Sequence, residues 1–218
     1  QAFSEEMTAR IKAEAELEPM AHMTCVGQTK EAVHRVLERL ENAGIENIIA
    51  LRGDMPPGQS DSAPEEGGFL HATDLIEHTR EHFRFGIAAA CYPEGHVESP
   101  DLSTDLTHTK LKVNKGADFL ITQLFYDNSY FFAFMDRARL AGIDAPIIPG
   151  VLPVLSAGQV RKFTALCGAK IPATLDEKLD KFAADDDAVR ELGVEHATRQ
   201  VEELWQAGVP GVHFYVLN

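Results

Sequence analysis

A charged pair at the end of a predicted strand is the part of the sequence best suited to chemistry. Arg52 and Asp54 are separated only by Gly53 and are followed by the rigid turn Pro56–Gly58. The preceding run, Asn47–Leu51, is aliphatic, as in a strand that is covered on both faces. Proteins of the α/β class place binding and catalytic groups at this end of their strands. The pattern therefore indicates a functional site, although a solvated ion pair in a loop is the simpler alternative.

Polar or aromatic residues recur at or just past the ends of the other predicted strands. They are His22 and Thr24, Tyr92 and His96, Gln123, the Pro149–Pro153 turn, and Tyr215. In a doubly wound open sheet such residues gather at one switch point. In a (β/α)8 TIM barrel they surround a single mouth. Because about six successive strands deliver them, we predict the barrel, with this chain supplying about six βα units.

The predicted strands alternate with predicted helices along the whole chain. We predict strands at residues 20–25, 47–51, 85–90, 119–125, 146–152 and 211–217, and helices at 3–17, 29–43, 73–83, 101–115, 129–141, 158–166, 171–182 and 188–206. The Pro149-Gly150 pair inside one predicted strand indicates a bend or an edge position. No linker composition divides the chain, so we interpret residues 1–218 as a single barrel domain.

The composition is that of an acidic globular protein. The chain has 218 residues, a formal net charge of −14 and 44% hydrophobic residues. A surface that binds nucleic acid needs a basic patch, so this charge argues against such a partner. No apolar run is long enough to span a membrane, and no secretion signal opens the chain. The three cysteines are far apart and form no C-x-x-C pair, which is typical of reduced thiols in a cytoplasmic protein.

Nucleotide-binding loops and a metal site find no support in the sequence. No G-x-G-x-x-G and no G-K-S/T loop follows a predicted strand, which weakens Rossmann and P-loop interpretations. His78 and His82 lie one helical turn apart and His71 lies nearby, but no third ligand with the usual spacing accompanies the pair. We therefore predict that the chain binds no metal.

Blocks of sequence along nearly the whole chain resemble the methylenetetrahydrofolate reductase family, specifically its flavin-binding catalytic barrel. They occur in the order of the family. The blocks are His22–Cys25, Leu51–Gly58, Tyr92–His96, Lys110 and Lys112 with Gly116–Asp118, Ile121–Phe125, Ile148–Pro153 and His213–Asn218. No single block is specific by itself, and the resemblance rests on their succession.

The resemblance implies an eight-stranded barrel that holds FAD non-covalently. It implies reduction of 5,10-methylenetetrahydrofolate to 5-methyltetrahydrofolate by ping-pong hydride transfer from NADH or NADPH through FAD. This reaction belongs to one-carbon metabolism and methionine biosynthesis, and we expect a cytoplasmic homo-oligomer. The family's first strand, first helix, second strand and C-terminal tail have no counterpart here, so we expect the working protein to be longer. The alternative is a flavin-free folate-binding relative, or a subunit that acts only within a complex.

The resemblance also assigns roles residue by residue. Asp54 and Gln123 match catalytic positions, where a carboxylate stabilises a cationic iminium of the folate and an amide contacts folate and nicotinamide. The general-acid glutamate of the family lies on the first strand, which this chain lacks. Substrate-binding positions match Asp54, Gln123, Gln159, Phe163 and Tyr215. Cofactor-binding positions match His22, Arg52, Gly53, Asp54, Ala72, Tyr92, His96, Ser99, Asp105, His108 and Lys112.

Several of these residues also have simpler structural interpretations. Asp54 equally suits the cap of a turn, and Phe163 equally suits the core face of an amphipathic helix. Histidines on apolar strands such as His22 are commonly hydrogen-bonded core residues. The helical face that carries Asp105, His108 and Lys112 is also what a solvated helix face looks like. Leu111 stands where many relatives carry arginine, which removes one expected polar contact with FAD.

Overall fold

The computed structural model describes residues 2–15, 17–53 and 67–216. Asp54 and the predicted turn Pro56–Gly58 lie outside these residues. The chain divides into two compact units. Unit 1 comprises residues 1–90 and 111–119, and unit 2 comprises residues 91–110 and 120–218.

Unit 1 is built on three parallel strands. They are β1 (Met20–Thr24), β2 (Asn47–Leu51) and β3 (Gly86–Cys91), of which the last residue belongs to unit 2. β2 lies between the other two, and Ile49 is paired with His22 of β1 and with Ala88 of β3. Ile49 and both of its neighbours in β2 are buried, which is why this run is aliphatic. The strand predicted at 47–51 is confirmed.

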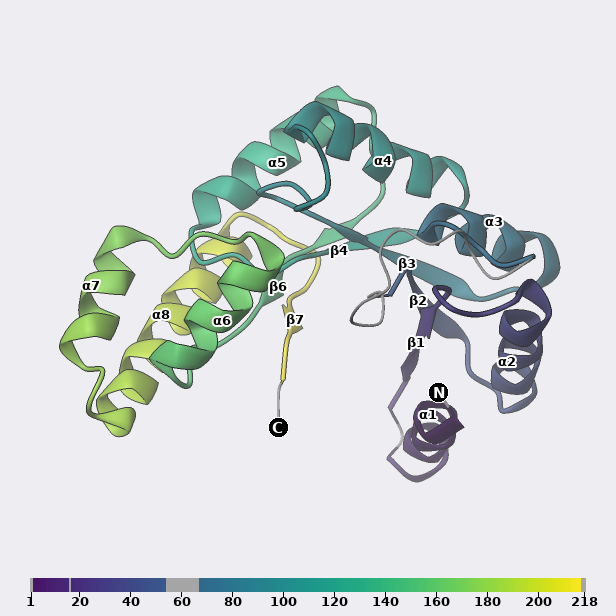
Figure 1. Cartoon of the computed structure of the whole chain (residues 1–218), viewed down its shortest axis with the longest axis horizontal. Coiled ribbons are helices and arrows are strands. Elements are labelled where there is room, and N and C mark those ends of the chain that lie inside the picture. The colour runs from purple at the N-terminus through teal and green to yellow at the C-terminus, as the bar shows by residue number, and fades with distance from the viewer. Residues whose placement is uncertain (1, 16, 54–66, 217–218) are drawn as a thin grey trace. The chain divides into compact units, whose positions relative to one another are not determined.

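Three helices belong to unit 1: α1 (Ala2–Glu14), α2 (Lys30–Asn42) and α3 (Ala72–His82) (Figure 1). α2 begins where the sequence predicts, because the Thr29 hydroxyl accepts a hydrogen bond from the Ala32 N–H. Its predicted stripe, Val33, Val36, Leu37 and Leu40, is buried. Past its end, Gly44 has a φ of +75°, the left-handed conformation that stops a helix. Local signals alone therefore determine this helix.

Arg80 and Asp118 join the end of α3 to the start of β3 and to the segment 111–119. The Arg80 guanidinium donates to the Phe85 and Gly116 carbonyls and forms an ion pair of 2.6 Å with Asp118. The same Asp118 oxygen accepts the Ile87 N–H at 2.8 Å, and the Asp118 N–H donates to the Ile87 carbonyl at 2.8 Å. The reciprocal pair fixes β3 against this segment.

Unit 2 holds the remaining elements, listed here with α4, which is shared by both units. They are α4 (Leu102–Asn114), β4 (Phe119–Thr122), α5 (Asn128–Leu140), β5 (Ile147–Ile148), β6 (Gly150–Val151), α6 (Ala157–Cys167), α7 (Ala173–Lys181), α8 (Asp186–Gln206) and β7 (His213–Phe214). β4 pairs in parallel with β5, and β6 pairs in parallel with β7. The alternation of helices with parallel strands confirms the predicted α/β class and is that of a TIM-barrel fragment.

The strand predicted at 146–152 is two strands, because the chain changes partner at Pro149. Proline has no N–H to donate to a ladder. The Pro149 carbonyl accepts the His213 N–H at 2.9 Å, and the Gly150 N–H donates to the Thr122 hydroxyl at 2.8 Å. β5 therefore stays with β4 while β6 pairs with β7. The predicted bend is confirmed, and the single continuous strand is wrong.

The strand predicted at 119–125 is also too long, since β4 ends at Thr122. Beyond this point, side chains of α8 bind the backbone where a neighbouring strand would. Gln200 donates to the Phe125 carbonyl at 2.8 Å, and the His196 ring lies 3.0 Å from the Tyr126 carbonyl oxygen. A run of apolar letters does not reveal such side-chain partners.

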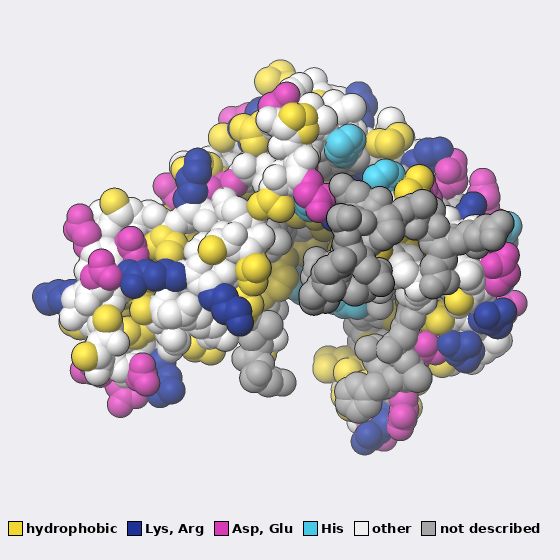
Figure 2. Space-filling model, viewed as in Figure 1, with side chains coloured by type: hydrophobic (Ala, Val, Ile, Leu, Met, Phe, Trp, Pro, Cys, Tyr) yellow, Lys and Arg dark blue, Asp and Glu magenta, His cyan; other side chains and the backbone are white. Residues whose placement is uncertain are grey.

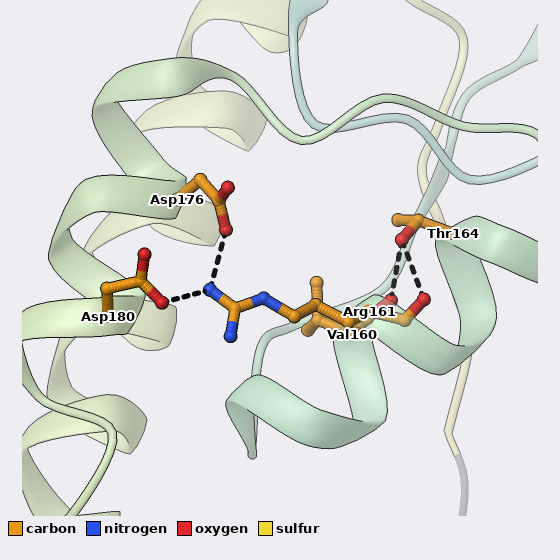
Figure 3. A network of polar contacts seen from close by, with 5 residues as sticks. All are labelled: Val160, Arg161, Thr164, Asp176 and Asp180. Atoms are coloured by element: carbon orange, nitrogen blue, oxygen red, sulfur yellow. Dashed lines mark hydrogen bonds and ion pairs between the residues drawn. The ribbon is translucent and has the colours of Figure 1, made fainter.

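The core of unit 2 lies under α6, α7 and α8. Its buried members are Leu124, Tyr126, Leu152, Val154, Val160, Leu175, Leu179, Val189 and Leu192. On the surface, Arg161 of α6 forms ion pairs with Asp176 at 2.8 Å and with Asp180 at 2.6 Å, both on α7 (Figure 3). One turn further along α6, the Thr164 hydroxyl donates to the Val160 carbonyl. The two ion pairs join α6 to α7, whereas the Thr164 bond lies within α6.

The surface of the helices carries mixed charge. Over α6 and α7, at the left of Figure 2, acidic and basic side chains alternate with hydrophobic ones. A surface of mixed charge favours solubility, whereas a surface of a single sign would attract partners of opposite charge. Within the described part of the chain, no helix combines the length and the apolar character that crossing a membrane requires.

We predict that Asp118→Ala destabilises the protein by about 1–2 kcal/mol, mainly because the Ile87 N–H loses its acceptor. The half-exposed ion pair with Arg80 accounts for less of the loss. Asp118→Asn keeps an acceptor and costs about half as much. Urea unfolding measures both variants, with the exposed Glu81→Ala as a control that stays within about 0.5 kcal/mol of wild type. Equal losses for Asp118→Ala and Asp118→Asn would contradict this account.

Candidate functional site

Tyr215 is held in place at the end of β7 by two strands. Its N–H donates to the Val151 carbonyl, and its hydroxyl donates to the Thr122 carbonyl, each at 2.9 Å. Burial raises the pKa of Tyr215 to about 12, so the hydroxyl keeps its proton at neutral pH. A Cβ on Gly150 would lie 2.6 Å from the tyrosine ring. Glycine is therefore required at position 150. Because the Tyr215 hydroxyl is bound to the Thr122 carbonyl, the ring is the part of this side chain that can contact a ligand.

The Tyr215 ring lines a cavity of about 120 Å³ together with two residues of α6, Gln159 and Phe163. The other lining residues are apolar: Leu152, Pro153, Leu155, Val160 and Val216. Ser156 caps the start of α6 by accepting the Gln159 N–H at 3.4 Å, and so sets the direction of the helix. A small apolar pocket with one amide suits a flat, uncharged ring with a single polar substituent. The structure thus brings three of the predicted substrate residues together.

Gln123 lies just past β4 in unit 2. Its N–H donates to the Cys91 carbonyl at 2.8 Å, and its side-chain oxygen accepts the Leu124 N–H at 3.0 Å. Because a backbone N–H can only donate, the Oε1 atom must face Leu124, and the NH2 group of Gln123 takes the other direction. Gln123 lines a second, much smaller cavity of about 10 Å³ together with Tyr92.

Four predicted cofactor residues form one connected group in unit 2. The rings of Tyr92 and His96 meet edge to face with centroids 4.6 Å apart. The His96 Nδ1 accepts the Glu98 N–H at 3.1 Å, which places the proton of the neutral ring on Nε2. The Ser99 N–H donates to the His96 carbonyl, and the Ser99 hydroxyl donates to the buried Asp105 at 3.4 Å. His108, also predicted, is exposed on α4.

Two of the predicted residues of unit 1, Arg52 and Gly53, directly follow β2. The Arg52 carbonyl accepts the Cys25 and Val26 N–H groups at 3.2 and 2.8 Å. Gly53 has a φ of +86°, and a Cβ there would lie 3.0 Å from Val26 and from Thr24. Only glycine suits this close approach. His22 is exposed on β1 and Ala72 opens α3, whereas Asp54 lies outside the described residues.

Lys112 has a contact that the sequence did not reveal. Its ammonium donates to the Ala90 carbonyl near the end of β3 at 2.8 Å. The sequence also drew no attention to Glu94, whose Oε2 atom is buried with no hydrogen-bond partner among the described residues. Glu94 lies inside the Tyr92–His96 block, so its position in that block is the one signal that pointed to it.

The two α3 histidines considered as metal ligands pack instead against a third from α2. The ring centroids of His78 and His82 are 4.5 Å apart, and the His34 Nδ1 lies 3.0 Å from the His78 Nε2. Phe69 and Phe83 contact the same rings. Across residues 2–15, 17–53 and 67–216, no group of three or more His, Cys, Asp or Glu residues has the geometry to hold a metal ion.

The fold and these residues define a class of protein. It is a parallel α/β protein whose candidate ligand site is built from residues at the carboxyl ends of its strands. The chain belongs to the methylenetetrahydrofolate reductase family, since the sequence profile described as "Methylenetetrahydrofolate reductase" matches residues 1–218.

Relatives in plants and bacteria carry the same name. The chain is 37% identical to "Methylenetetrahydrofolate reductase (NADH) 1" of Arabidopsis thaliana, over 98% of this chain and 38% of the relative. It is 38% identical to "5,10-methylenetetrahydrofolate reductase" of Escherichia coli, over 95% of this chain and 68% of the relative. The chain thus spans well under half of the plant protein and about two thirds of the bacterial one.

One solved structure shares the fold. It is described as "Uncharacterized protein from Clostridium thermocellum binds two copies of 5-methyl-5,6,7,8-tetrahydrofolic acid". It matches 94% of this chain and 70% of its own length with a TM-score of 0.55. At 18% sequence identity, this likeness shows the fold alone.

We predict that Gly150→Ala destabilises the protein by about 2 kcal/mol, because the added methyl group overlaps the Thr122 carbonyl oxygen and the Tyr215 ring and displaces the ring. Thermal unfolding measures the loss, and quenching of tyrosine fluorescence reports the movement of the ring. Gly211→Ala is the matched control, since a Cβ there meets no atom within 4 Å. Similar unfolding temperatures for the two variants would refute the tight packing at Gly150.

We predict that the histidine cluster makes stability depend on pH. Burial, and then the neighbouring His82, His34 and Lys30, lower the pKa of His78 from 6.5 to about 4. The folded state therefore binds fewer protons than the unfolded state, and stability is lost as the pH falls from 6.5 towards 4.

The variant His78→Gln cannot titrate, so its unfolding temperature should fall by about 3 °C less than that of wild type between pH 7 and pH 5. Differential scanning calorimetry at both pH values measures this difference. His71→Gln, at an exposed position just before α3, is the control and should keep the wild-type slope. If the unfolding temperature of His78→Gln falls between pH 7 and pH 5 as much as that of wild type, the cluster does not contribute to the pH dependence of stability.

Proposed function

We propose that the protein to which this chain belongs reduces 5,10-methylenetetrahydrofolate to 5-methyltetrahydrofolate, with NADH or NADPH as the reductant and FAD as the cofactor. Membership of the family supports the reaction. The observation that carries the proposal is the apolar cavity lined by Gln159, Phe163 and Tyr215. Two residues of α6 chosen from the sequence meet there with Tyr215, which lies far along the chain.

Within each unit separately, residues in or before α4 have the chemistry that suits the sugar or phosphate groups of FAD. In unit 2, the carboxylate of Asp105 suits a ribose hydroxyl, and the Nε2–H of His96 is a fixed donor. In unit 1, the Lys112 ammonium lies beside the end of β3 and carries the positive charge that suits a diphosphate. Bound FAD would supply hydride transfer in two separate steps, one from the dinucleotide and one to the folate.

The remaining predicted cofactor residues are also assigned contacts with FAD, separately within each unit. In unit 1 they are Arg52 and Gly53, which directly follow β2, together with His22 of β1 and Ala72 of α3. In unit 2, Tyr92, Ser99 and His108 lie in or beside the group that includes His96 and Asp105. Leu111 is exposed and apolar, so it offers no polar contact to the cofactor.

The cavity lined by Gln159, Phe163 and Tyr215 fits either the aromatic ring of a folate or the nicotinamide ring. The two rings would occupy it one after the other. Phe163 and Tyr215 offer faces and edges for stacking, and Gln159 offers an amide. The relative from Clostridium thermocellum, which shares the fold, is described as binding a methylated tetrahydrofolate. That description supports a folate as the ligand here.

Two side chains are proposed to act directly on the reacting groups. Gln123 directs its NH2 group away from Leu124, so it can donate to a carbonyl of the folate or of the nicotinamide. Asp54 is proposed to stabilise the positive charge of the iminium that forms when the five-membered ring of the folate opens. We assign the proton donor to none of the residues of this chain.

We further propose a cytoplasmic homo-oligomer. Cys25, Cys91 and Cys167 form no disulfide, and Cys25 and Cys91 are buried. Thiols that stay unpaired are typical of a reducing compartment. Burial raises the pKa of Cys25 to about 11, so this thiol is protonated and unreactive at neutral pH.

The decisive test uses the full-length protein. We predict that it purifies yellow, bleaches under NADH or NADPH without oxygen, and regains its colour when methylenetetrahydrofolate is added. Gln123→Ala should lower kcat/KM for the folate by about tenfold or more, because it removes a hydrogen-bond donor to the ligand. Gln206→Ala, at an exposed amide at the end of α8, is the control and should match wild type.

A flavin-free folate-binding relative is the second candidate. A colourless protein that rejects added FAD but binds methyltetrahydrofolate in calorimetry would establish it and would overturn the reductase proposal. If the protein bleaches but does not regain its colour when the folate is added, the FAD proposal stands and methylenetetrahydrofolate is excluded as the substrate. The two measurements therefore separate the cofactor from the substrate.

A further inference from the structure

The small cavity beside Gln123 is a place where a buried polar group lacks a partner. It is formed by the loop after β3, the residues after β4 and the end of α6. Its lining residues are Tyr92, Pro93, Glu94, Gly95, Gln123, Leu124, Cys167 and Ala169. At about 10 Å³ it has room for a single water molecule and for no larger ligand.

Glu94 is the acidic group of this cavity. Its Oε1 atom accepts the Lys170 N–H at 3.2 Å. Its Oε2 atom is buried and has no hydrogen-bond partner among the residues described. Desolvation raises the pKa of Glu94, which favours its protonated form. The Oε2 atom can bond to a water in either protonation state, because a carboxylate oxygen accepts and a carboxyl O–H donates. The oxygen without a protein partner therefore suits a water molecule.

Gln123 brings the second polar group of the cavity. Its Oε1 atom is held by the Leu124 N–H at 3.0 Å, so its NH2 group is the end of the amide that remains for other partners. Cys167 also lines the cavity, and burial raises the pKa of its thiol, so this residue adds no charge. One water molecule has two O–H groups and two lone pairs, so it can accept one Gln123 N–H and bond to the Glu94 Oε2 atom at once.

We propose that Glu94 is a positioning residue for Gln123 and acts through one water molecule held in this cavity. The bridge fixes the Gln123 amide by one of its N–H groups and leaves the other for the ligand. Glu94 itself touches neither substrate nor cofactor. The inference rests on the proposed function, in which Gln123 contacts the folate, and it adds the group that sets the orientation of that amide.

The kinetic test compares two Glu94 variants in the full-length, FAD-loaded protein. Glu94→Gln keeps an acceptor for the Lys170 N–H and a donor for the water, and its KM for the folate should stay within about threefold of wild type. Glu94→Met has similar length but neither group, and its KM should rise by about tenfold with a smaller change in kcat. Glu177→Met, at an exposed carboxylate on α7, is the matched control for removal of a charge.

A double-mutant cycle separates positioning from a general loss of structure. If Glu94 acts through Gln123, adding Glu94→Met to Gln123→Ala should raise KM by less than about twofold further. A full additional tenfold rise in the double variant would overturn the proposal. So would an equal loss in Glu94→Gln and Glu94→Met.

A crystal structure at high resolution decides the matter independently of activity. We expect one ordered water within hydrogen-bond distance of both the Glu94 Oε2 and the Gln123 Nε2 atoms, and its loss in Glu94→Met. A dry cavity, or a water that contacts only one of the two, would overturn the proposal. A wild-type protein that turns over no folate would contradict the proposed function instead, and the crystallographic result would still decide on the bridge.

Discussion

Thr122 is the residue on which the geometry of the candidate site depends. It is completely buried at the end of β4, and both of its oxygen atoms are used. The hydroxyl accepts the Gly150 N–H, and the carbonyl accepts the Tyr215 hydroxyl. These two bonds connect β4, β6 and β7 at a single point. The position of the Tyr215 ring, and so the wall of the cavity, follows from one buried threonine and one glycine.

This junction also explains why one chain segment serves two pairs of strands. At Pro149 the backbone has no N–H to continue the ladder of β5, and the next residue donates to a side chain instead. The short β6 is thereby free to pair with β7. Residues after Val151 then line the cavity on their way to α6. A break in one strand thus supplies both the support and part of the lining of the site.

The sequence predicted most of what local chemistry determines. The strand at 47–51 and the helix that begins after Thr29 are confirmed, because hydrophobic period and capping residues lie within a few positions of each other. The end of β4 and the division at Pro149 depend on partners far along the chain, such as Gln200 and Thr122. Such contacts leave no periodic signal in the sequence.

The candidate site was likewise predictable only in part. Gln159, Phe163 and Tyr215 were chosen by resemblance, and only the structure brings them to one cavity. The contact of Lys112 with Ala90 and the buried oxygen of Glu94 were not predictable, because each depends on where a backbone carbonyl or a void lies. The roles of Asp54 and of the cofactor residues stay predictions. Residue type indicates what a side chain can do, and packing decides whether it is in a position to do it.

The ion pairs of Arg161 have a consequence for how solution conditions reach the site. α6 carries Gln159 and Phe163 on one face and Arg161 on another, where Arg161 pairs with Asp176 and Asp180. These exposed pairs weaken as dissolved ions screen them. Raising the ionic strength would therefore loosen the helix that forms one wall of an uncharged pocket. Binding of a neutral ring would then become sensitive to salt without any charge on the ligand itself.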